Sequence, residues 1–344
     1  MKHIRNDSTD PYYNLALEEY VLTTFRDGQY ILLWQNYKAV VIGKHQNAAE
    51  EVNIKRAEEL GVKIVRRNTG GGAVYHDLGN LNFSFITDWD PDKDMDYDTF
   101  LKPVIHALSK FELEAEKQGR NDLVIDGKKI SGNAQCISNP AHTCLIPHSE
   151  FRIPNSNKGR ILHHGTLLID SELSVMPELL NVPPDKIVSK GIKSVRSRVA
   201  NINDFTVKPL DSDLLKKAIL ESFFNGGDVI EKFLTGAQKK DVERLAKEKY
   251  ETWEWNYGLS PAYSYKNAKR FPAGKVEVRL DVKNGIIENC KIYGDFLALV
   301  GVEDLETAVT GCRADINDLK RALEHFDLQR YYGITIDQLL ECFV

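Results

Sequence analysis

The stretch from Arg66 to Phe85 reads R-R-N-T-G-G-G-A-V-Y-H-D-L-G-N-L-N-F-S-F. Its three consecutive glycines lack Cβ atoms, so this backbone can adopt positive φ angles and approach a ligand closely. Successive N–H groups in such a turn form a concavity that binds anions. The guanidinium of Arg67 adds a charged fork that suits carboxylate or phosphate. A purely structural loop is the alternative, but the crowding of Arg67, His76, Asp77 and Asn80 favours a site.

The residues after the turn alternate between polar and apolar, which predicts a strand. The apolar row is Leu81, Phe83 and Phe85, and the polar row is Asn80, Asn82 and Ser84. One face can therefore pack on a core while the other face lines a polar cleft. A second strand, expected at 62–66, delivers the chain into the turn.

Composition limits the class of protein. The 344 residues favour two domains over one. A hydrophobic content of 42% and a charged content of 28% are typical of a globular protein. The net charge of −5 argues against a general nucleic-acid binder. No apolar run reaches about 18 residues, so no membrane span is expected, and the first residues lack the apolar core of a signal peptide.

The five cysteines are scattered and form no C-x-x-C pair, which predicts reduced thiols in a cytoplasmic protein. His163 and His164 could join His76 and Asp77 around a metal ion. Their spacing matches no standard ligand pattern, so we expect no metal held by side chains.

Other elements follow from local signals. Asp10 and Pro11 suit the N-cap and first position of a helix. Trp34, at the end of an expected strand, is more typical of a core anchor than of a stacking platform. Gly61 suits the end of a helix. Strands are expected at 30–34 and 39–42, and helices at 48–60, 99–116, 214–224 and 238–249.

Residues 119–136 read G-R-N-D-L-V-I-D-G-K-K-I-S-G-N-A-Q-C. The pair Asp126-Gly127 predicts a hairpin. Alternation along the return strand places Lys129 in a polar row and Gly132 and Ala134 in the opposite row of small and apolar residues. The polar row is Lys129, Ser131, Asn133 and Gln135, and the opposite row is Ile130, Gly132, Ala134 and Cys136. A solvated lysine at a sheet edge is the alternative for Lys129.

Two further regions complete the organisation. Residues 190–199, K-G-I-K-S-V-R-S-R-V, carry four cations among small residues and suit a loop that folds over an anion, although a solvated basic loop is equally consistent. The helix expected at 238–249 is dense in charged residues. After it, aromatic residues cluster, and Asn284-Gly285 predicts a hairpin. We therefore expect domains at 1–245 and 250–344, the second without a catalytic constellation.

The chemistry follows from what is present and absent. The sequence has no Walker A motif, no dinucleotide fingerprint and no nucleophile elbow. A lysine and backbone donors without an obvious base indicate catalysis by positioning and charge stabilisation. Formation of an acyl-adenylate, in which a carboxylate attacks the α-phosphate of ATP, is such a reaction.

Five motifs, in order, resemble bacterial lipoate–protein ligase A over essentially the whole chain: R-R-N-T-G-G-G-A-V-Y-H-D-L-G-N, G-R-N-D-L, K-I-S-G-N-A-Q, H-H-G-T-L-L and K-G-I-K-S-V-R-S-R-V. The resemblance implies an α+β fold, in which a biotin/lipoate-ligase-like catalytic domain has mixed, mainly antiparallel sheets flanked by helices. A small α+β accessory domain follows it.

The resemblance also implies the reaction. Such a ligase activates lipoate with ATP and Mg²⁺ to lipoyl-AMP and releases pyrophosphate. It then transfers the lipoyl group to one lysine of an acceptor, either a lipoyl domain of a 2-oxoacid dehydrogenase E2 subunit or the glycine-cleavage H protein. This is lipoate salvage in the cytoplasm, with no nucleic-acid or membrane partner expected.

By motif, Lys129 would contact both the lipoate carboxylate and the α-phosphate as the catalytic residue. The implied ATP and adenylate contacts are Arg67, Thr69, Gly70, Gly71, Gly72, Ala73, Val74, Tyr75, His76, Asn80 and Thr166. The implied lipoate contacts are Trp34, Arg67, Gly132, Ala134 and His164, and the implied covering loop contains Lys190, Gly191, Ser194, Val195 and Arg196. Cys136 stands where some members of the family have arginine.

Three alternatives remain open. An octanoyl or lipoyl transferase of the same fold would use a cysteine shortly before the lysine strand, where this sequence has G-R-N-D at 119–122. A biotin ligase would need a G-R-G-R-x-G-R loop, which is absent. A non-catalytic lipoate-binding protein need not keep both Lys129 and Arg67.

Overall fold

A computed structural model describes residues 1–90, 96–138, 159–181, 198–257, 265–283, 285–314 and 316–343. The strands are β1 (Lys2–Ile4), β2 (Tyr30–Trp34), β3 (Ala39–Ile42), β4 (Lys63–Arg66), β5 (Val74–His76), β6 (Asn80–Asp88), β7 (Glu116–Gln118), β8 (Asp122–Ile125), β9 (Lys128–Ser138), β10 (Arg160–Leu168), β11 (Glu231–Lys232), β12 (Tyr265–Phe271), β13 (Gly274–Lys283) and β14 (Ile286–Gly294).

The α-helices are α1 (Pro11–Thr24), α2 (Ala48–Glu51), α3 (Ile54–Glu59), α4 (Asp98–Ser109), α5 (Met176–Leu179), α7 (Ser212–Phe223), α8 (Gly236–Leu245), α9 (Trp253–Asn256), α10 (Glu303–Val309), α11 (Ile316–Leu323), α12 (Leu328–Tyr332) and α13 (Ile336–Leu340). A 3-10 turn, η2 (Ile202–Phe205), and a π-helical turn, η3 (Ala246–Tyr250), complete the set. None of the described helices is long and apolar enough to cross a bilayer.

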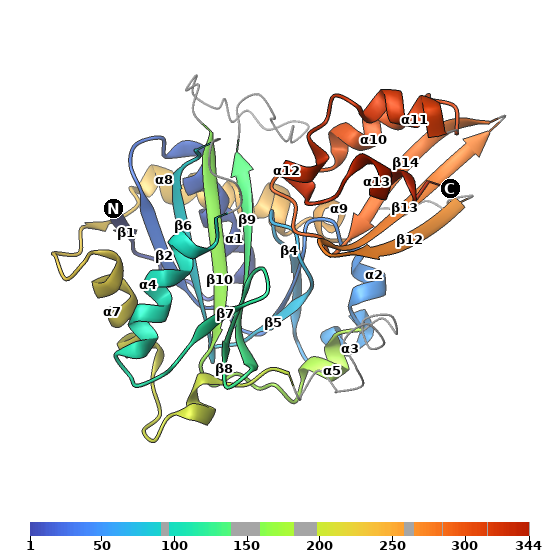
Figure 1. Cartoon of the computed structure of the whole chain (residues 1–344). Helices are drawn as coiled ribbons and strands as arrows, with labels where there is room; N and C mark the ends of the chain where they lie inside the picture. The colour runs from blue at the N-terminus through green and yellow to red at the C-terminus, as the bar shows by residue number, and fades with distance from the viewer. Residues whose placement is uncertain are drawn as a thin grey trace.

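A large sheet organises the first part of the molecule, with the order β11-β1-β2-β6-β10-β9-β8-β7 among the described strands. β1 pairs in parallel with β2 and β11, whereas the other neighbours pair antiparallel. α4 and α7 cover one face, and α1 and α8 cover the other (Figure 1). The mixed, mainly antiparallel sheet flanked by helices confirms the predicted fold class.

The stretch 66–85 connects two sheets. β4 ends at Arg66 in a small sheet of order β4-β3-β5, the glycine turn follows, and β5 returns alongside β3 before β6 enters the large sheet. The predicted rows of β6 are confirmed. Phe83 and Phe85 pack into the core beneath α4 and α7, while Ser84 faces α1, where it hydrogen bonds Glu18.

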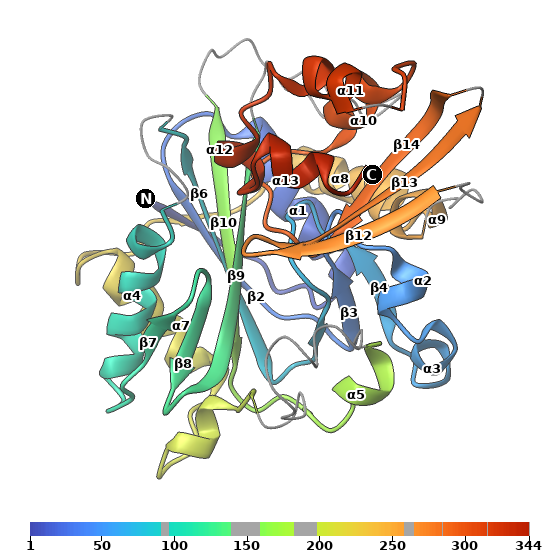
Figure 2. The ribbon, with the colours of Figure 1, turned by 45° about the vertical axis from the view of Figure 1, so that its right-hand side comes forward.

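A C-terminal unit contains the sheet β12-β13-β14 and the helices α10 to α13, around a core of its own. Figure 2 shows this unit above the small sheet. It contacts the first part directly, because the Gly71 N–H donates to the Phe296 carbonyl at 3.2 Å and the Ile137 N–H donates to the Leu299 carbonyl at 2.7 Å.

Two helix predictions were too long. The helix expected at 48–60 is broken into α2 and α3, because Asn53 caps a new helix by accepting from the Arg56 N–H. The helix expected at 99–116 ends at Ser109, and Glu112 turns the chain with a φ of 61° before β7. The predicted N-cap at Asp10 and the hairpin at Asp126-Gly127 are confirmed.

Candidate active site

One cavity brings the glycine turn and Lys129 together. It has a volume of about 150 Å³ and lies between the small sheet and the β9–β10 part of the large sheet. Its lining residues are Leu15, Trp34, Val41, Arg67, Gly71, Gly72, Ala73, Val74, His76, Asn82, Asn121, Lys129, Gly132, Asn133, Ala134, His164, Gly165, Thr166 and Leu297. Basic and polar groups therefore share one hollow with the apolar side chains of Leu15, Val41 and Val74.

Lys129 reaches this cavity because of a β-bulge. Val124 pairs with Lys129 and Leu123 pairs with Ser131, so β9 carries one extra residue opposite β8. A bulge resets the alternation of side chains along a strand. Lys129 consequently shares a face with Gly132, where an added Cβ would lie 3.0 Å from its Nζ. The expectation that Lys129 points with Ser131, Asn133 and Gln135 is therefore wrong.

Two contacts fix Lys129. Its ammonium pairs with Asp122 on the neighbouring strand at 2.6 Å. Its backbone bonds to the chain that follows residues 182–197, because its N–H donates to the Arg198 carbonyl at 2.7 Å and the Ala200 N–H donates to its carbonyl at 3.0 Å. The basic segment predicted to cover an anion thus rejoins the described chain beside Lys129.

Arg67 braces the glycine turn from within. Its Nη2 donates to the carbonyls of Gly70 and Gly72 at 2.7 and 2.9 Å, and its Nη1 donates to the Val41 carbonyl. Gly71 has a φ of 93°, a conformation that favours glycine. The turn is also tightly enclosed, since a Cβ on Gly70 would overlap the Phe296 carbonyl. The guanidinium shapes the turn while it lines the cavity.

Arg66 and Arg67 place positive charge beside the cavity without a direct carboxylate partner among the described residues. Arg66 donates to the carbonyls of Gly43, Lys44, Gln46, Trp255 and Asn256. Burial lowers the pKa of both guanidiniums to about 10, so both stay charged at neutral pH. Both guanidiniums are held by uncharged oxygens, including Thr69 Oγ1 for Arg67, and the nearby Glu18 carboxylate offsets part of the Arg67 charge. The positive charge that remains attracts an anionic ligand.

A hydrogen-bonded chain crosses the wall of the cavity. Trp34 Nε1 donates to Ser84 Oγ at 2.8 Å, and Ser84 donates to Glu18 Oε1 at 2.6 Å. His164 joins Glu18 through Nδ1 at 2.9 Å and Thr69 Oγ1 through Nε2 at 2.8 Å. The chain links the apolar wall at Trp34 to the start of the glycine turn.

His76 also lines the cavity, and burial lowers its pKa to about 3, which keeps the imidazole neutral. Its Nδ1 lies 3.1 Å from Asn36 Nδ2. A neutral imidazole can serve as a donor or acceptor to a ligand without adding charge. Thr166 accepts the Gly132 N–H at 3.2 Å, which ties β10 to β9 at the cavity.

Most of the predicted side chains meet in this cavity. Those that line it are Trp34, Arg67, Gly71, Gly72, Ala73, Val74, His76, Lys129, Gly132, Ala134, His164 and Thr166. Those that lie behind the lining are Thr69, Gly70, Tyr75 and Asn80, the last of which donates to Asn82. Lys190, Gly191, Ser194, Val195 and Arg196 lie outside the described residues.

Sequence reasoning missed several residues. Leu297 reaches the cavity from the C-terminal unit, and no local pattern marks it. Glu18 lies buried in α1, for which the sequence predicted only the N-cap at Asp10 and the start at Pro11. Asn121 lies in the quoted motif G-R-N-D-L, so its signal was available. Leu15, Val41, Asn133 and Gly165 also line the cavity without having been predicted to, whereas Asn82 belongs to the polar row that was expected to line a cleft.

Two observations bear on other chemistries. Burial raises the pKa of the Cys136 thiol well above its ordinary value, so it is not a ready nucleophile. The described residues contain no group of three or more His, Cys, Asp or Glu side chains able to hold a metal.

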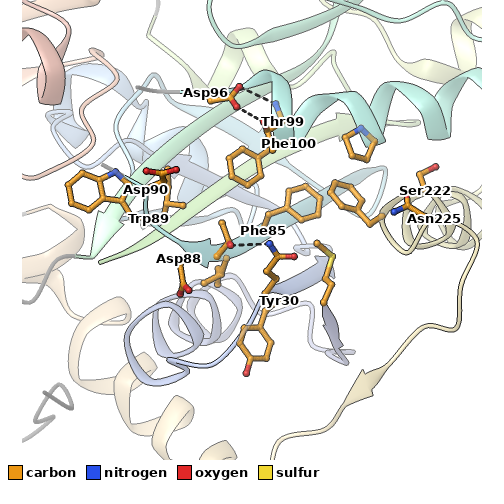
Figure 3. A pocket seen from close by; sticks show the side chains of 17 residues that line it. Tyr30, Phe85, Asp88, Trp89, Asp90, Asp96, Thr99, Phe100, Ser222 and Asn225 are labelled. Carbon is orange, nitrogen blue, oxygen red and sulfur yellow. Dashed lines mark hydrogen bonds between the residues drawn. The ribbon is translucent and has the colours of Figure 1, made fainter. Parts of the chain in front are cut away.

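A larger cavity of about 370 Å³ lies near the end of β6, beside α4 and α7. Figure 3 shows Phe85 and Phe100 inside it, with Asp88, Asp90 and Asp96 nearby. The described residues that line it include none of the predicted site residues and no cationic side chain, whereas they include three carboxylates, which do not favour an anionic substrate.

Comparison with known proteins gives matches along nearly the whole chain. Residues 10–146 and 154–224 match the model of the lipoyl protein ligase A/B catalytic domain. Residues 260–343 match the model of the bacterial lipoate protein ligase C-terminus. The chain is 43% identical to lipoate-protein ligase LplJ of Bacillus subtilis over 337 residues, which covers 96% of each chain. It is 42% identical to lipoate–protein ligase 1 of Staphylococcus aureus over 335 residues, which covers 97% of this chain and 96% of that one.

Solved structures give the same fold. LipL1 of P. falciparum in complex with lipoate superposes with a TM-score of 0.77 at 22% identity, covering 99% of this chain and 98% of that one. A lipoate-protein ligase A bound with ATP gives 0.60 at 27% identity, covering 75% and 99%. The bipartite archaeal ligase of Thermoplasma acidophilum, described with its E2 lipoyl domain, gives 0.61 at 30% identity, covering 77% and 98%.

Proposed function

The chain belongs to the lipoate–protein ligase family, and we propose that it joins lipoate to ATP and passes the lipoyl group to a lysine of an acceptor protein. One observation carries this proposal more than any other. Lys129 and the glycine turn line the same small cavity, as an acyl-adenylate site requires. The ligase A structure with bound ATP supports a nucleotide at this fold.

In the first step, a carboxylate oxygen of lipoate attacks the α-phosphorus of ATP, the bond from that phosphorus to the bridging oxygen breaks, and pyrophosphate leaves. Both reactants are anions, so cationic groups must hold them together. Lys129 would contact both, and its ammonium would stabilise the charge that develops at phosphorus. Arg66 and Arg67 would add the surrounding positive potential.

The lining suggests how the substrates lie. Leu15, Trp34, Val41 and Val74 supply an apolar end suited to the lipoyl chain. The turn at Gly71–Ala73, with Thr166 and His76, supplies the polar end for the adenylate. Tyr75, Thr69, Gly70 and Asn80 would act from behind this surface. The residues Lys190, Gly191, Ser194, Val195 and Arg196 would cover the adenylate, a proposal supported by the return of the chain to Lys129 at Arg198.

Magnesium would enter with ATP. Mg²⁺ is commonly held by substrate phosphates and water with one or two carboxylates, and needs no dedicated protein cage. Asp122, which pairs with Lys129, would be one such carboxylate. Bound there, Mg²⁺ would neutralise part of the phosphate charge.

In the second step, the amine of an acceptor lysine attacks the acyl carbon, the bond to the phosphate oxygen breaks, AMP leaves and the amine loses a proton. The description of the archaeal ligase together with an E2 lipoyl domain supports E2 lipoyl domains as acceptors. We propose these domains and the H protein as partners, lipoate salvage as the role and the cytoplasm as the location. We also retain the division into 1–245 and 250–344 as a proposal.

The decisive experiment mixes the protein with lipoate, Mg²⁺, ATP and apo forms of candidate acceptors, and weighs the products. We expect lipoate-dependent exchange of pyrophosphate into ATP and a lipoyl mass increment on at least one acceptor. An octanoyl transferase would instead modify the acceptor from an octanoylated donor without ATP. A lipoate-binding protein would bind lipoate and give neither product, and either result would refute the ligase assignment.

A further inference from the structure

Helix α1 buries a carboxylate behind the cavity. Glu18 is 1% exposed and does not line the cavity. Burying a carboxylate costs free energy unless hydrogen bonds compensate for lost water. Glu18 accepts those bonds from Ser84 on β6 and from His164 on β10, so it is attached to two sides of the cavity.

The first attachment reaches the proposed acyl wall. Glu18 Oε1 accepts the Ser84 hydroxyl at 2.6 Å, and Ser84 in turn accepts the Trp34 indole N–H at 2.8 Å. Trp34 is 4% exposed and lines the cavity. The orientation of this indole is therefore set through Ser84 by the carboxylate.

The second attachment reaches the glycine turn. His164 Nδ1 lies 2.9 and 3.1 Å from the two oxygens of Glu18, and its Nε2 lies 2.8 Å from Thr69 Oγ1. Arg67 Nε donates to the same Thr69 oxygen at 3.0 Å. Arg67 then holds the carbonyls of Gly70 and Gly72, so the chain ends in the turn itself.

Counting the available protons shows which group donates in each of these hydrogen bonds. A guanidinium only donates and a carboxylate only accepts. Thr69 therefore accepts from Arg67 and satisfies its own hydroxyl proton by donating to His164 Nε2. His164 keeps its proton on Nδ1 and donates it to Glu18. Every donor in the chain has an acceptor when His164 is the neutral Nδ1–H tautomer.

We propose that Glu18 is a positioning residue for adenylate formation, which holds the acyl wall at Trp34 and the phosphate turn at Gly70–Gly72 in register through one chain of hydrogen bonds. This inference rests on the proposed ligase function. Small displacements of bound reactants have large kinetic effects, because reaction requires near-attack geometry. A residue that touches no substrate can thus control how the two anions meet.

Glu18→Gln tests the proposal with almost no change of shape. With its amide oxygen in the place of Oε1, the glutamine still accepts from Ser84 and from His164 Nδ1–H, but its NH₂ then stands in the place of Oε2, 3.1 Å from the same nitrogen, where a donor faces a donor. We expect the bond donated by His164 Nδ1–H to weaken and the population of the Nε2–H tautomer to rise, which disturbs Thr69. We expect kcat of lipoate-dependent pyrophosphate exchange to fall by roughly 10- to 100-fold, with a smaller change in KM, because the bound reactants are misaligned.

The tautomer is read directly from the ¹⁵N NMR spectrum of the histidine-labelled protein, with His164 assigned by its loss in His164→Asn. Glu19→Gln is the matched control on the same helix. Glu19 is buried and bonds to Lys249, Tyr250 and Asn68, so it meets the backbone just before Thr69 without joining the bonds of His164. We expect Glu19→Gln to lower Tm while the His164 signals stay those of the wild type.

Distinct results separate the possible failures. Wild-type kcat in Glu18→Gln would overturn the positioning role alone, and so would a lowered kcat with His164 ¹⁵N signals identical to those of the wild type. A wild-type protein without lipoate-dependent exchange would refute the proposed function together with the inference.

If Glu18→Gln does not fold, two other variants test the two sets of hydrogen bonds separately. Ser84→Ala removes the bonds toward Trp34, and Thr69→Val removes the bonds toward the glycine turn. Ser84→Ala should raise KM for lipoate, and Thr69→Val should raise KM for ATP. Equal effects of both variants on both substrates would contradict the division.

Discussion

The cavity and the C-terminal unit treat buried charge in opposite ways. Beside the cavity, Arg66 and Arg67 bind only uncharged oxygens of the described residues. In the C-terminal unit, Glu277 is 1% exposed and bonds Lys275 and Arg279 at 2.9 and 2.6 Å. In the C-terminal unit the paired charge supports the fold, whereas Arg66 and Arg67 make no direct contact with a carboxylate of the described residues and leave positive charge beside the cavity. Lys129 is the exception there, since its ammonium pairs with Asp122. The following variants test that contrast.

Lys129→Ala should give the largest effect. Loss of an ammonium that stabilises transition-state charge typically lowers kcat by about 10²- to 10³-fold. The assay is lipoate-dependent pyrophosphate exchange, with Tm measured in parallel. Lys128→Ala is the control, because this neighbouring lysine is exposed and lies over the Phe205 ring instead of lining the cavity. Equal losses in the two variants would contradict a specific role for Lys129.

Gly132→Ala should give an intermediate effect on rate with little effect on stability. Its Cβ would lie 3.0 Å from Nζ and 3.2 Å from Cε of Lys129, so the flexible end of that lysine must shift. We expect kcat to fall about tenfold, because a displaced ammonium meets the phosphate poorly. Gly236→Ala, where an added Cβ meets nothing within 4 Å, is the control. Wild-type kcat in Gly132→Ala would place the reacting atoms away from Lys129 Nζ.

Glu277→Gln should affect stability and leave exchange activity unchanged. Burial acts to raise the pKa of Glu277, but hydrogen bonds from Lys275 and Arg279 outweigh it and hold the pKa below its ordinary value of 4.5. The carboxylate therefore stabilises the fold fully above that value, and this contribution is lost as pH falls through the lowered pKa. We expect a loss of about 1.5–3 kcal/mol at pH 7 by urea denaturation.

The difference between wild type and Glu277→Gln should shrink as the solution becomes more acidic than pH 4.5. Glu288→Gln is the control, since Glu288 is 56% exposed and pairs with Lys283 at 3.9 Å. An exposed pair of this kind contributes at most about 1 kcal/mol. A pH-independent difference for Glu277→Gln would mean that the charge of this residue is not what stabilises the unit.

Cys136→Ala should give the smallest effect. The thiol is buried and its pKa is raised, so it supplies no thiolate to the reaction. We expect unchanged kcat for both exchange and acceptor modification, with a modest fall in Tm from the lost packing. Loss of acceptor modification with exchange intact would favour a thioester route.

The sequence predicted the strands and the meeting of the turn with Lys129, because both depend on local signals and on ordered motifs. It misjudged the direction of Lys129, since alternation assumes a regular strand and the bulge between Leu123 and Val124 leaves no clear mark in composition. Glu18 was missed because an acidic residue in a helix is normally exposed. Leu297 was missed because its place depends on how the C-terminal unit packs, which no local pattern encodes.

The hydrogen bonds between Arg66 and the pair Trp255-Asn256 decide where this polypeptide can be divided. Arg66 donates to the carbonyls of Trp255 and Asn256, and the Trp255 indole donates back to the Arg66 carbonyl. A shortened version that stops before Asn256 would uncover a buried guanidinium beside the glycine turn. A cut at the proposed boundary between residues 245 and 250 would separate Arg66 from Trp255 and Asn256, so stop codons, fusion joints and protease sites are better placed after Tyr257.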